Sequence, residues 1–261
     1  MATRSSRLRP SPSRPVLPPV ERSGPRVPAS LHTDPEGPRS RSEADRALLH
    51  GLATRTRTVE RRGEVLEQGE VPGLAHVLLE GHTCRYRRLR SGRRQITALL
   101  VPGDLCDVEA VVKGRADFGV AALTPCRLGE IPGARIREAT DREPEVAAVL
   151  LRRLRLDEAI AREWIVNLGN RDATARMAHL LCEVRARLDA VGLAGEDGYA
   201  LPLGQGELGE ALGLSSVHVN RVLRELRVAG LVTLANRRLT IHDRPGLERL
   251  ADFDPAYLSP Q

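Results

Sequence analysis

The stretch from residue 207 to residue 241 constrains the fold most, because helix and strand patterns follow each other there in a fixed order. Gly213 stands where a helix C-terminus needs a residue at positive φ, and Ser215 is placed to cap the helix that follows. This second helix is predicted over residues 216–229, because Gly230 ends its apolar periodicity. The pattern therefore predicts two short helices joined by a tight turn.

A β-hairpin is predicted directly after the second helix. Residues 231–234 and 238–241 are β-rich, and Ala235-Asn236-Arg237 separates them. Arg237 and Arg238 give the tip of this hairpin a positive charge. Helix, turn, helix and basic hairpin together are typical of a winged helix-turn-helix that binds DNA, and the combination is more specific than any one part.

The two faces of the predicted helix 216–229 differ in chemistry. One face is apolar and is expected to be buried. The other carries side chains suited to DNA, because Arg can bond guanine, Asn can bond adenine and Val can pack against a thymine methyl. An ordinary amphipathic helix with a solvated arginine face is the alternative. The residues expected to meet DNA here are Ser215, Ser216, Val217, His218, Asn220, Arg221 and Arg224.

Residues 143–169 are predicted to form one long helix, because after Pro144 neither glycine nor proline interrupts the run up to Leu168. Apolar residues recur along it at coiled-coil spacing, which needs a partner surface. A symmetric homodimer is favoured, and a long helix in the core of a single chain is the alternative. The predicted dimerisation residues are Leu150, Leu154, Ala161, Trp164 and Leu168.

Short strand-like runs punctuated by glycine fill residues 56–132 and predict an antiparallel barrel or roll within a sensor domain over residues 42–142. A tight hairpin is predicted where Leu78-Leu79-Glu80-Gly81 is followed by residues 83–89. A short helix is expected before the roll, with Ser42 as its N-cap. The predicted strands are Thr56–Arg61, Ala75–Glu80, Thr83–Leu89, Gln95–Val101, Phe118–Ala122 and Arg127–Ile131.

The two ends of the chain carry weaker patterns. Residues 1–41 are rich in proline and arginine, hold little that could form a core, and are predicted to be a disordered tail. Eight arginines against three acids in residues 1–42 supply most of the net charge of +6, so overall basicity alone does not indicate DNA binding. Residues 244–261 are expected to form a C-terminal tail.

From Glu43 to His242 the sequence resembles the Crp/Fnr superfamily of bacterial regulators. The resemblance implies an α+β chain: an N-terminal cyclic-nucleotide-binding-like β-roll over residues 42–142, a long dimerisation helix, and a C-terminal winged helix-turn-helix over residues 170–243. The motifs that carry it in the first half are Arg62-Gly63-Glu64-Val65-Leu66, Gln68-Gly69-Glu70, Val77-Leu78-Leu79-Glu80-Gly81 and Val101-Pro102-Gly103-Asp104. Those in the second half are Glu207-Leu208-Gly209, Leu212-Gly213-Leu214-Ser215, Val219-Asn220-Arg221-Val222-Leu223 and Ala229-Gly230-Leu231-Val232.

The resemblance also implies how such a chain acts. Family members bind near-palindromic double-stranded DNA as homodimers, with half-sites about one helical turn apart, and RNA polymerase is an expected partner. Arg221 matches the arginine that the family uses to contact a base or phosphate, and Gln205 matches a phosphate contact. Val217 stands where a glutamate is usual, with His218 where threonine is common, so the half-site is expected to differ at one position.

The effector loop departs from the pattern of cyclic-nucleotide binders. Asp107-Val108 stands where Gly-Glu is expected, and Asp117-Phe118 stands near the expected Arg-Ser. An aspartate in place of the phosphate-binding arginine repels an anion. Residues 1–83 hold no cysteine for an iron–sulfur cluster, and haem bound through His76 or His82 is a weaker alternative. We therefore expect no cofactor, with ligand-dependent DNA binding as the alternative.

Other classes of function lack support in the sequence. Cys84, Cys106, Cys126 and Cys182 form no Cys-x-x-Cys pair, so ordinary buried thiols are favoured over a metal or redox site. No motif of a hydrolase, a nucleotide-binding loop or a metalloprotease is present, and an enzyme is not expected. With no apolar run long enough for a membrane span and no secretory signal, the protein is expected in the cytoplasm.

Overall fold

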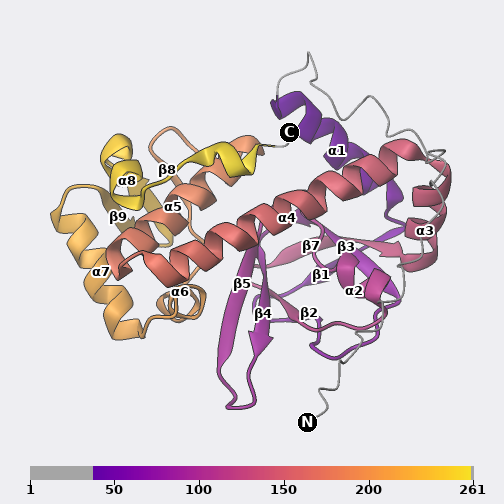
Figure 1. Ribbon diagram of the computed structural model, residues 1–261, viewed down its shortest axis with the longest axis horizontal. Helices are drawn as coiled ribbons and strands as arrows, with labels where there is room; N and C mark the ends of the chain where they lie inside the picture. The colour runs from indigo at the N-terminus through magenta and orange to yellow at the C-terminus, as the bar shows by residue number, and fades with distance from the viewer. Residues whose placement is uncertain (1–37, 260–261) are drawn as a thin grey trace, which may run out of the picture.

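The computed structural model describes residues 38–259, with side chains from residue 43 onward. A β-rich N-terminal half and a helical C-terminal half are joined by the long helix α4 (Pro144–Asn170), which runs across both (Figure 1). Among the described helices none is long and apolar enough to cross a lipid bilayer. This is the order of roll, long helix and winged helix-turn-helix that the sequence predicts.

Helix α1 (Pro38–Leu52) begins four residues before the predicted start at Ser42. Proline suits a first helical turn, because its φ is already close to the helical value and its missing N–H would have no partner there. Ser42 therefore lies inside the helix, and its prediction as the N-cap is wrong. The predicted tail of residues 1–41 lies outside the described residues except for its last four, which are helical.

The described strands of the N-terminal half form two antiparallel sheets, ordered β1-β7-β3 and β2-β6-β4-β5. All six predicted strands are confirmed, with ends that differ by at most two residues. Strand β2 has three residues, too few to produce a recognisable alternation, and was missed. The strands are β1 (Arg55–Val59), β2 (Glu64–Leu66), β3 (Leu74–Glu80), β4 (Thr83–Arg88), β5 (Arg94–Leu100), β6 (Gly119–Ala122) and β7 (Cys126–Pro132).

The predicted tight hairpin between β3 and β4 is wrong, because the two strands belong to different sheets. β3 pairs with β7, whereas β4 pairs with β5 and β6. The chain crosses between the sheets at Gly81, where φ is 87° and a Cβ atom would lie 2.4 Å from the Pro125 carbonyl oxygen. The His82 N–H donates to Thr124 Oγ1 at 2.9 Å, so this crossing packs against the crossing between β6 and β7.

Two short helices close the roll. Helix α2 (Val108–Lys113) buries Val108, Ala110 and Val111, and helix α3 (Gly133–Arg142) buries Ile136 and Ala139. Val108, Val111 and these two α3 residues join the apolar cluster that includes Leu49, Leu52 and the first turns of α4. Neither helix was predicted from the sequence, because both are short and lie next to strands.

The two faces of α4 have different environments. Leu150 and Trp164, predicted as dimer contacts, are buried in the core of their own chain, with exposed fractions of 9% and 6%. The Trp164 Nε1–H donates to Glu183 at 3.1 Å, which fixes the indole against α5. Leu154 and Ala161 are exposed and Leu168 is half-buried. The prediction of Leu150 and Trp164 as surfaces free for a partner is therefore corrected.

The C-terminal half is built around helix α5 (Ala173–Ala190), whose cap Asp172 accepts hydrogen bonds from the Thr174 and Ala175 N–H groups. Its inner face packs against the two motif helices, and the small sheet has the order β8-β10-β9. The remaining elements of the motif are β8 (Gly198–Ala200), α6 (Gln205–Leu212), α7 (Ser216–Val228), β9 (Val232–Ala235) and β10 (Arg238–Ile241).

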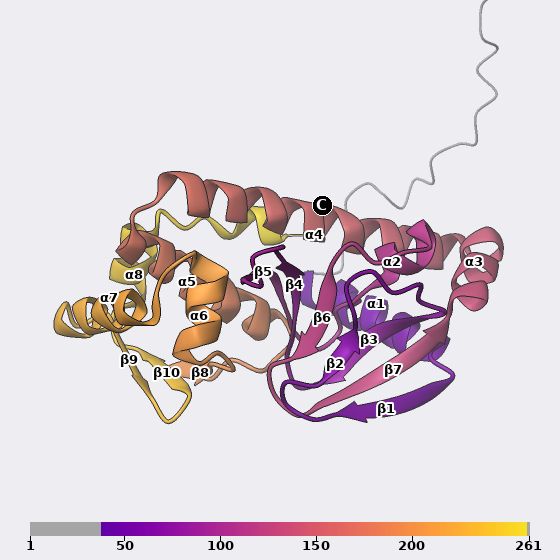
Figure 2. The same ribbon diagram turned by 90° about the horizontal axis from the view of Figure 1, so that it is seen from below.

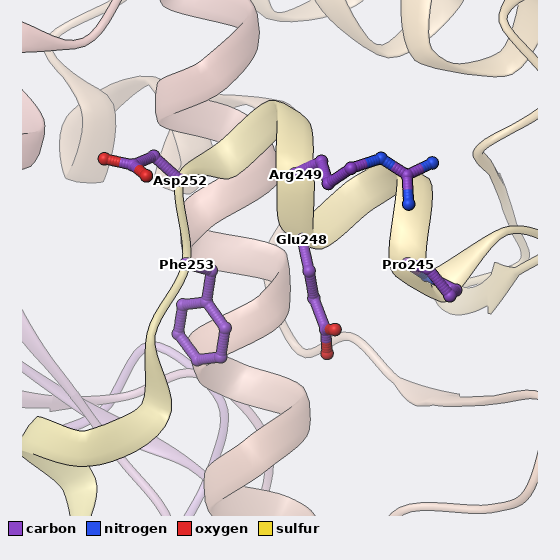
Figure 3. Close-up of a pocket in the computed structure, with 5 residues that line it drawn as sticks. All are labelled: Pro245, Glu248, Arg249, Asp252 and Phe253. Atoms are coloured by element: carbon purple, nitrogen blue, oxygen red, sulfur yellow. The ribbon is translucent and has the colours of Figure 1, made fainter.

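The C-terminal segment, predicted as a tail, is folded. Helix α8 (Arg244–Ala251) and the 3-10 turn η2 (Pro255–Leu258) pack on α5 and α4. Phe253 lies edge-on to His179 at 5.3 Å between ring centroids. A shallow pocket beside α8 is lined by side chains that point in different directions (Figure 3), so they do not converge on a common ligand position.

Candidate nucleic-acid interface

Helix α7 has one buried and one exposed face, as the sequence predicts. Val219, Val222 and Leu226 are fully buried, whereas Val217 is 81% exposed. The Ser215 hydroxyl accepts a hydrogen bond from the His218 N–H at 3.2 Å and caps the helix. The helix ends at Val228, one residue before the predicted end. The predicted DNA contacts on the exposed face are Ser215, Ser216, Val217, Asn220, Arg221 and Arg224, with His218 partly exposed on the flank.

The turn between α6 and α7 is closely packed. Gly213 has the predicted positive φ, at 66°, and ends α6. Gly209 matters as much, because a Cβ atom there would lie 2.5 Å from the Leu214 carbonyl oxygen. The Leu214 N–H also donates to the Gly209 carbonyl at 3.0 Å. These two glycines allow the two helices to cross at short range, which fixes the direction in which α7 projects.

The start of α6 lies beside the exposed face of α7. The Asn220 side-chain amide donates to the Gln205 Oε1 at 3.0 Å, and both residues are exposed. Arg221 contacts the His218 ring and lies 3.6 Å from the Glu225 carboxylate. Gln205, Asn220, His218 and Arg221 therefore form one continuous polar surface, drawn from both motif helices.

The wing has the predicted basic tip. Asn236 and Arg237 have φ values of 49° and 58°, which make a two-residue turn of the kind that matches the twist of the flanking strands. Ala235 and Arg238 face each other across this turn. Arg237 and Arg238 are both exposed. The asparagine at the first turn position fits, because asparagine tolerates positive φ better than most residues.

Ion pairs that were not predicted from the sequence hold the motif against the roll. Arg61 lies 2.9 Å from Glu207, and Arg94 lies 2.8 Å from Glu210, so both pairs reach α6 from the roll. Buried Arg187 of α5 bonds Asp104 at 2.5 Å and the Leu99 carbonyl at 2.6 Å. No local pattern could reveal contacts between residues 83 to 146 positions apart in the chain.

A buried arginine of β4 reaches the loop that the resemblance assigns to an effector. Arg85 of β4 donates to the Leu105 carbonyl at 2.7 Å and the Cys106 carbonyl at 2.8 Å. Its guanidinium also lies 2.9 Å from Asp157 of α4 and 3.2 Å from Glu109 of α2. Its side chain is 9% exposed. This one buried cation therefore links the sheet, the loop, α2 and the long helix.

The same loop does not fit a cyclic nucleotide. Asp107 is fully buried and bonds the His76 ring at 2.5 Å, and Asp117 is paired with Lys113 at 2.7 Å. Phe118 lies under the Arg85 guanidinium, with 5.6 Å from its ring centroid to the arginine carbon. Asp117 stands near the place of the anion-binding arginine, and the buried Arg85 already has two carboxylate partners. The exposed Arg115 lies two residues before Asp117 in the chain.

The four cysteines are free thiols that lie buried in the protein. Burial raises the pKa of Cys84 and of Cys182 to about 12 and that of Cys106 well above its usual value. High pKa values keep these sulfurs protonated and unreactive. Within residues 38–259 no group of three or more His, Cys, Asp or Glu side chains is placed to hold a metal ion.

Comparison with known protein families gives two matches that together span more than half of the chain. Residues 56–143 match the cyclic nucleotide-binding domain, and residues 175–250 match the Crp-like helix-turn-helix domain. The chain belongs to the Crp/Fnr superfamily. It is accordingly a DNA-binding transcription regulator.

The relatives of this Crp/Fnr regulator cover most of both chains. The nitrogen fixation regulation protein FixK of Bradyrhizobium diazoefficiens is 28% identical over 72% of this chain and 78% of its own length. The anaerobic regulatory protein of Haemophilus influenzae is 23% identical over 80% of this chain and 81% of its own. The solved structure of FixK2 from Bradyrhizobium japonicum has a TM-score of 0.68 at 24% identity, covering 75% of this chain and 96% of that one, which indicates the same fold.

Proposed function

We propose that this Crp/Fnr regulator binds a near-palindromic DNA site as a homodimer, with α7 of each subunit in one of two successive major grooves. The observation that carries the proposal is the exposed polar face of α7, which is continuous with Gln205 and is followed by a basic wing. Arg221 and Asn220 are the groups suited to read base edges, and Arg237 and Arg238 are suited to phosphate. Half-sites lie about 34 Å apart in this arrangement.

The outer face of α4 supports the homodimer. Leu151, Leu154 and Ile165 are exposed, by 48%, 40% and 71%. With Ala147, Glu158, Ala161 and Leu168 they recur at alternating intervals of four and three residues, which is the spacing of a coiled-coil seam. A second copy of the same helix covers such a seam. This set replaces Leu150 and Trp164 by Leu151 and Ile165 in the predicted dimer contacts, and it adds Ala147 and Glu158.

We also propose that DNA binding needs no small molecule in the roll. Arg85 supports this, because its contacts with Glu109 and Asp157 join the loop to α4 without a ligand. The pairing of Asp107 with His76 and of Asp117 with Lys113 points the same way. If DNA binding depended on a ligand in this loop, the contacts of Arg85 with Glu109 and Asp157 would have to break to admit it.

The remaining assignments follow from regulation of transcription. RNA polymerase is the proposed partner on DNA, and the cytoplasm is the proposed compartment. We assign no catalytic activity, because the family to which the chain belongs consists of regulators.

Selection from randomised duplex DNA tests the proposal, using purified, reduced protein without added ligand. An enriched near-palindrome is the expected result, and it would support specific dimeric binding without an effector. Ile165→Glu, which places a charge in the seam, should weaken self-association and reduce binding to the full palindrome. Enrichment only after cell extract is added would show that an effector is required, and no enrichment under either condition would contradict the proposal.

A further inference from the structure

The β4–β5 hairpin is the most basic surface segment of the described chain. Residues 85–94 hold six arginines and no acidic residue. Arg85 points into the roll and Arg94 pairs with α6, but Arg87, Arg88, Arg90 and Arg93 are exposed. Within the part of the chain that the structure describes, none of these four forms an ion pair. The hairpin turns through Gly92, at a φ of 80°, so its tip carries two of them on a short loop.

Most of this exposed charge has no acidic partner within the part of the chain that the structure describes. Arg88 and Arg94 face each other across the two strands, and like charges in directly opposed positions are destabilising. Both guanidiniums lie over the Tyr86 ring, at 5.7 and 5.0 Å from its centroid, so the two cations share one aromatic ring. A cluster of exposed arginines without acidic partners among the described residues fits an anionic partner outside the chain.

The hairpin is attached to the DNA-reading half of the molecule. Arg94 Nε donates to Glu210 at 2.8 Å, and the Gln95 amide donates to the Ala211 carbonyl at 3.2 Å, both on α6 (Figure 1). Seen from below, the hairpin again lies beside α6, which lies between it and α7 (Figure 2). The base of the hairpin is therefore anchored to α6, which carries the exposed Gln205 at its start.

We propose that the β4–β5 hairpin binds the phosphates of DNA that flanks the half-site read by α7. The proposal rests on the proposed function and adds a second contact surface to it. Guanidinium groups match phosphate oxygens with two parallel hydrogen bonds, and they need no particular base sequence. DNA is favoured over an acidic protein because the hairpin is fixed to the same helix that opens the helix-turn-helix.

Two duplexes separate this contact from recognition of the core site. One carries only the selected palindrome, and the other carries the same palindrome with about 15 additional base pairs on each side. The test protein is R90A/R93A, and the matched control is R137A/R142A. The control removes the same charge from α3, which lies at the end of α4 away from the helix-turn-helix (Figure 1). All four positions are exposed, so folding should be retained.

On the long duplex, R90A/R93A should bind more weakly, and the slope of log affinity against log salt should fall by about 0.9 for each phosphate that the variant no longer neutralises. On the core duplex it should bind like the unaltered protein, and R137A/R142A should behave normally on both. Equal weakening on both duplexes, or no change on either, would overturn the proposal. The core duplex tests the proposed function separately, because unaltered protein that bound neither duplex would overturn both.

Discussion

Arg85 and Arg221 carry the same guanidinium group, but Arg85 is buried among its own partners and Arg221 is exposed to solvent. Arg85 lies inside the roll with two carboxylates and two carbonyl groups as partners. Arg221 projects from α7 with its side chain 64% exposed, and its nearest carboxylate lies 3.6 Å away on the same helix. The first has its hydrogen-bonding capacity filled by its own chain, and the second leaves most of it for another molecule.

The difference separates stability from recognition. Removing one partner of a buried charge network leaves the others desolvated and unpaired, which destabilises the fold. Removing an exposed charge changes the stability little, but it removes the group that meets DNA. Substitutions in the two regions should therefore have effects that do not overlap.

The largest expected effect is on folding. Arg85→Ala leaves Asp157, Glu109 and two carbonyl groups without their common donor, and should lower the free energy of unfolding by about 3–5 kcal/mol. Burial raises the pKa of Asp157 and Arg85 acts against this rise, so the ionised carboxylate depends on Arg85. Urea titration measures the change, and exposed Arg137→Ala is the control, with an expected change within about 0.5 kcal/mol. A loss below about 1 kcal/mol for Arg85→Ala would contradict the structural role.

Arg221→Ala should have the opposite profile. Removal of one bidentate bond to a base costs about 1–3 kcal/mol of binding free energy, or roughly 5- to 150-fold in affinity for the selected site. The free energy of unfolding should stay within about 0.5 kcal/mol of that of the unaltered protein. Arg221→Lys keeps the charge without the planar fork, so partial recovery would indicate a phosphate contact and no recovery would indicate a base contact. Full affinity in Arg221→Ala would remove Arg221 from the interface.

His82 extends the comparison to pH, because its half-buried ring in the sensor half can change its charge as the pH falls. Burial lowers the pKa of His82 to about 4, and nearby Arg187 acts in the same direction. A lowered histidine pKa favours the neutral form in the folded state. Its contribution to stability is therefore present above about pH 6.5 and is lost as the pH falls toward about 4.

His82→Gln removes this titration. Between pH 7 and pH 5 the variant should lose less stability than the unaltered protein, by roughly 1–2 kcal/mol. Urea titrations at the two pH values measure this difference. An equal loss of stability in both proteins would show that protonation of His82 does not lower the free energy of unfolding.

The recognition surface was more predictable than the buried network. Helix α7 and the wing are set by residues close together in the chain: Ser215 caps, Gly213 turns and Gly230 stops. Local rules therefore place Arg221 and Arg237 on the surface correctly. The partners of Arg85 come from three separate elements, and only the folded chain brings Asp157 to β4. Sequence alone could not show which of the many arginines are buried.

The long helix α4 also shows that sequence patterns predict an element better than they predict its packing. Its bounds were predicted within one residue, because Pro144 at its start and an unbroken helical run define it. The sequence pattern did not show which face of α4 packs against its own chain and which faces outward, because apolar residues occur on both faces. Trp164 is the largest of them and fits coiled-coil spacing, but Glu183 of α5 supplies the partner that its indole N–H needs in the core. Choosing the outward seam required knowledge of where α5 packs.

The smallest expected effect concerns the apolar residue on the recognition surface. Val217 is 81% exposed, so replacing it should leave the stability unchanged within about 0.5 kcal/mol. If its methyl groups pack against thymine, Val217→Glu removes packing worth about 1 kcal/mol and introduces an acceptor for the cytosine amino group. Selection with the variant should then change the preferred base at one position of each half-site. An unchanged site would show that Val217 does not face a base, and would leave reading of the sequence to Asn220 and Arg221.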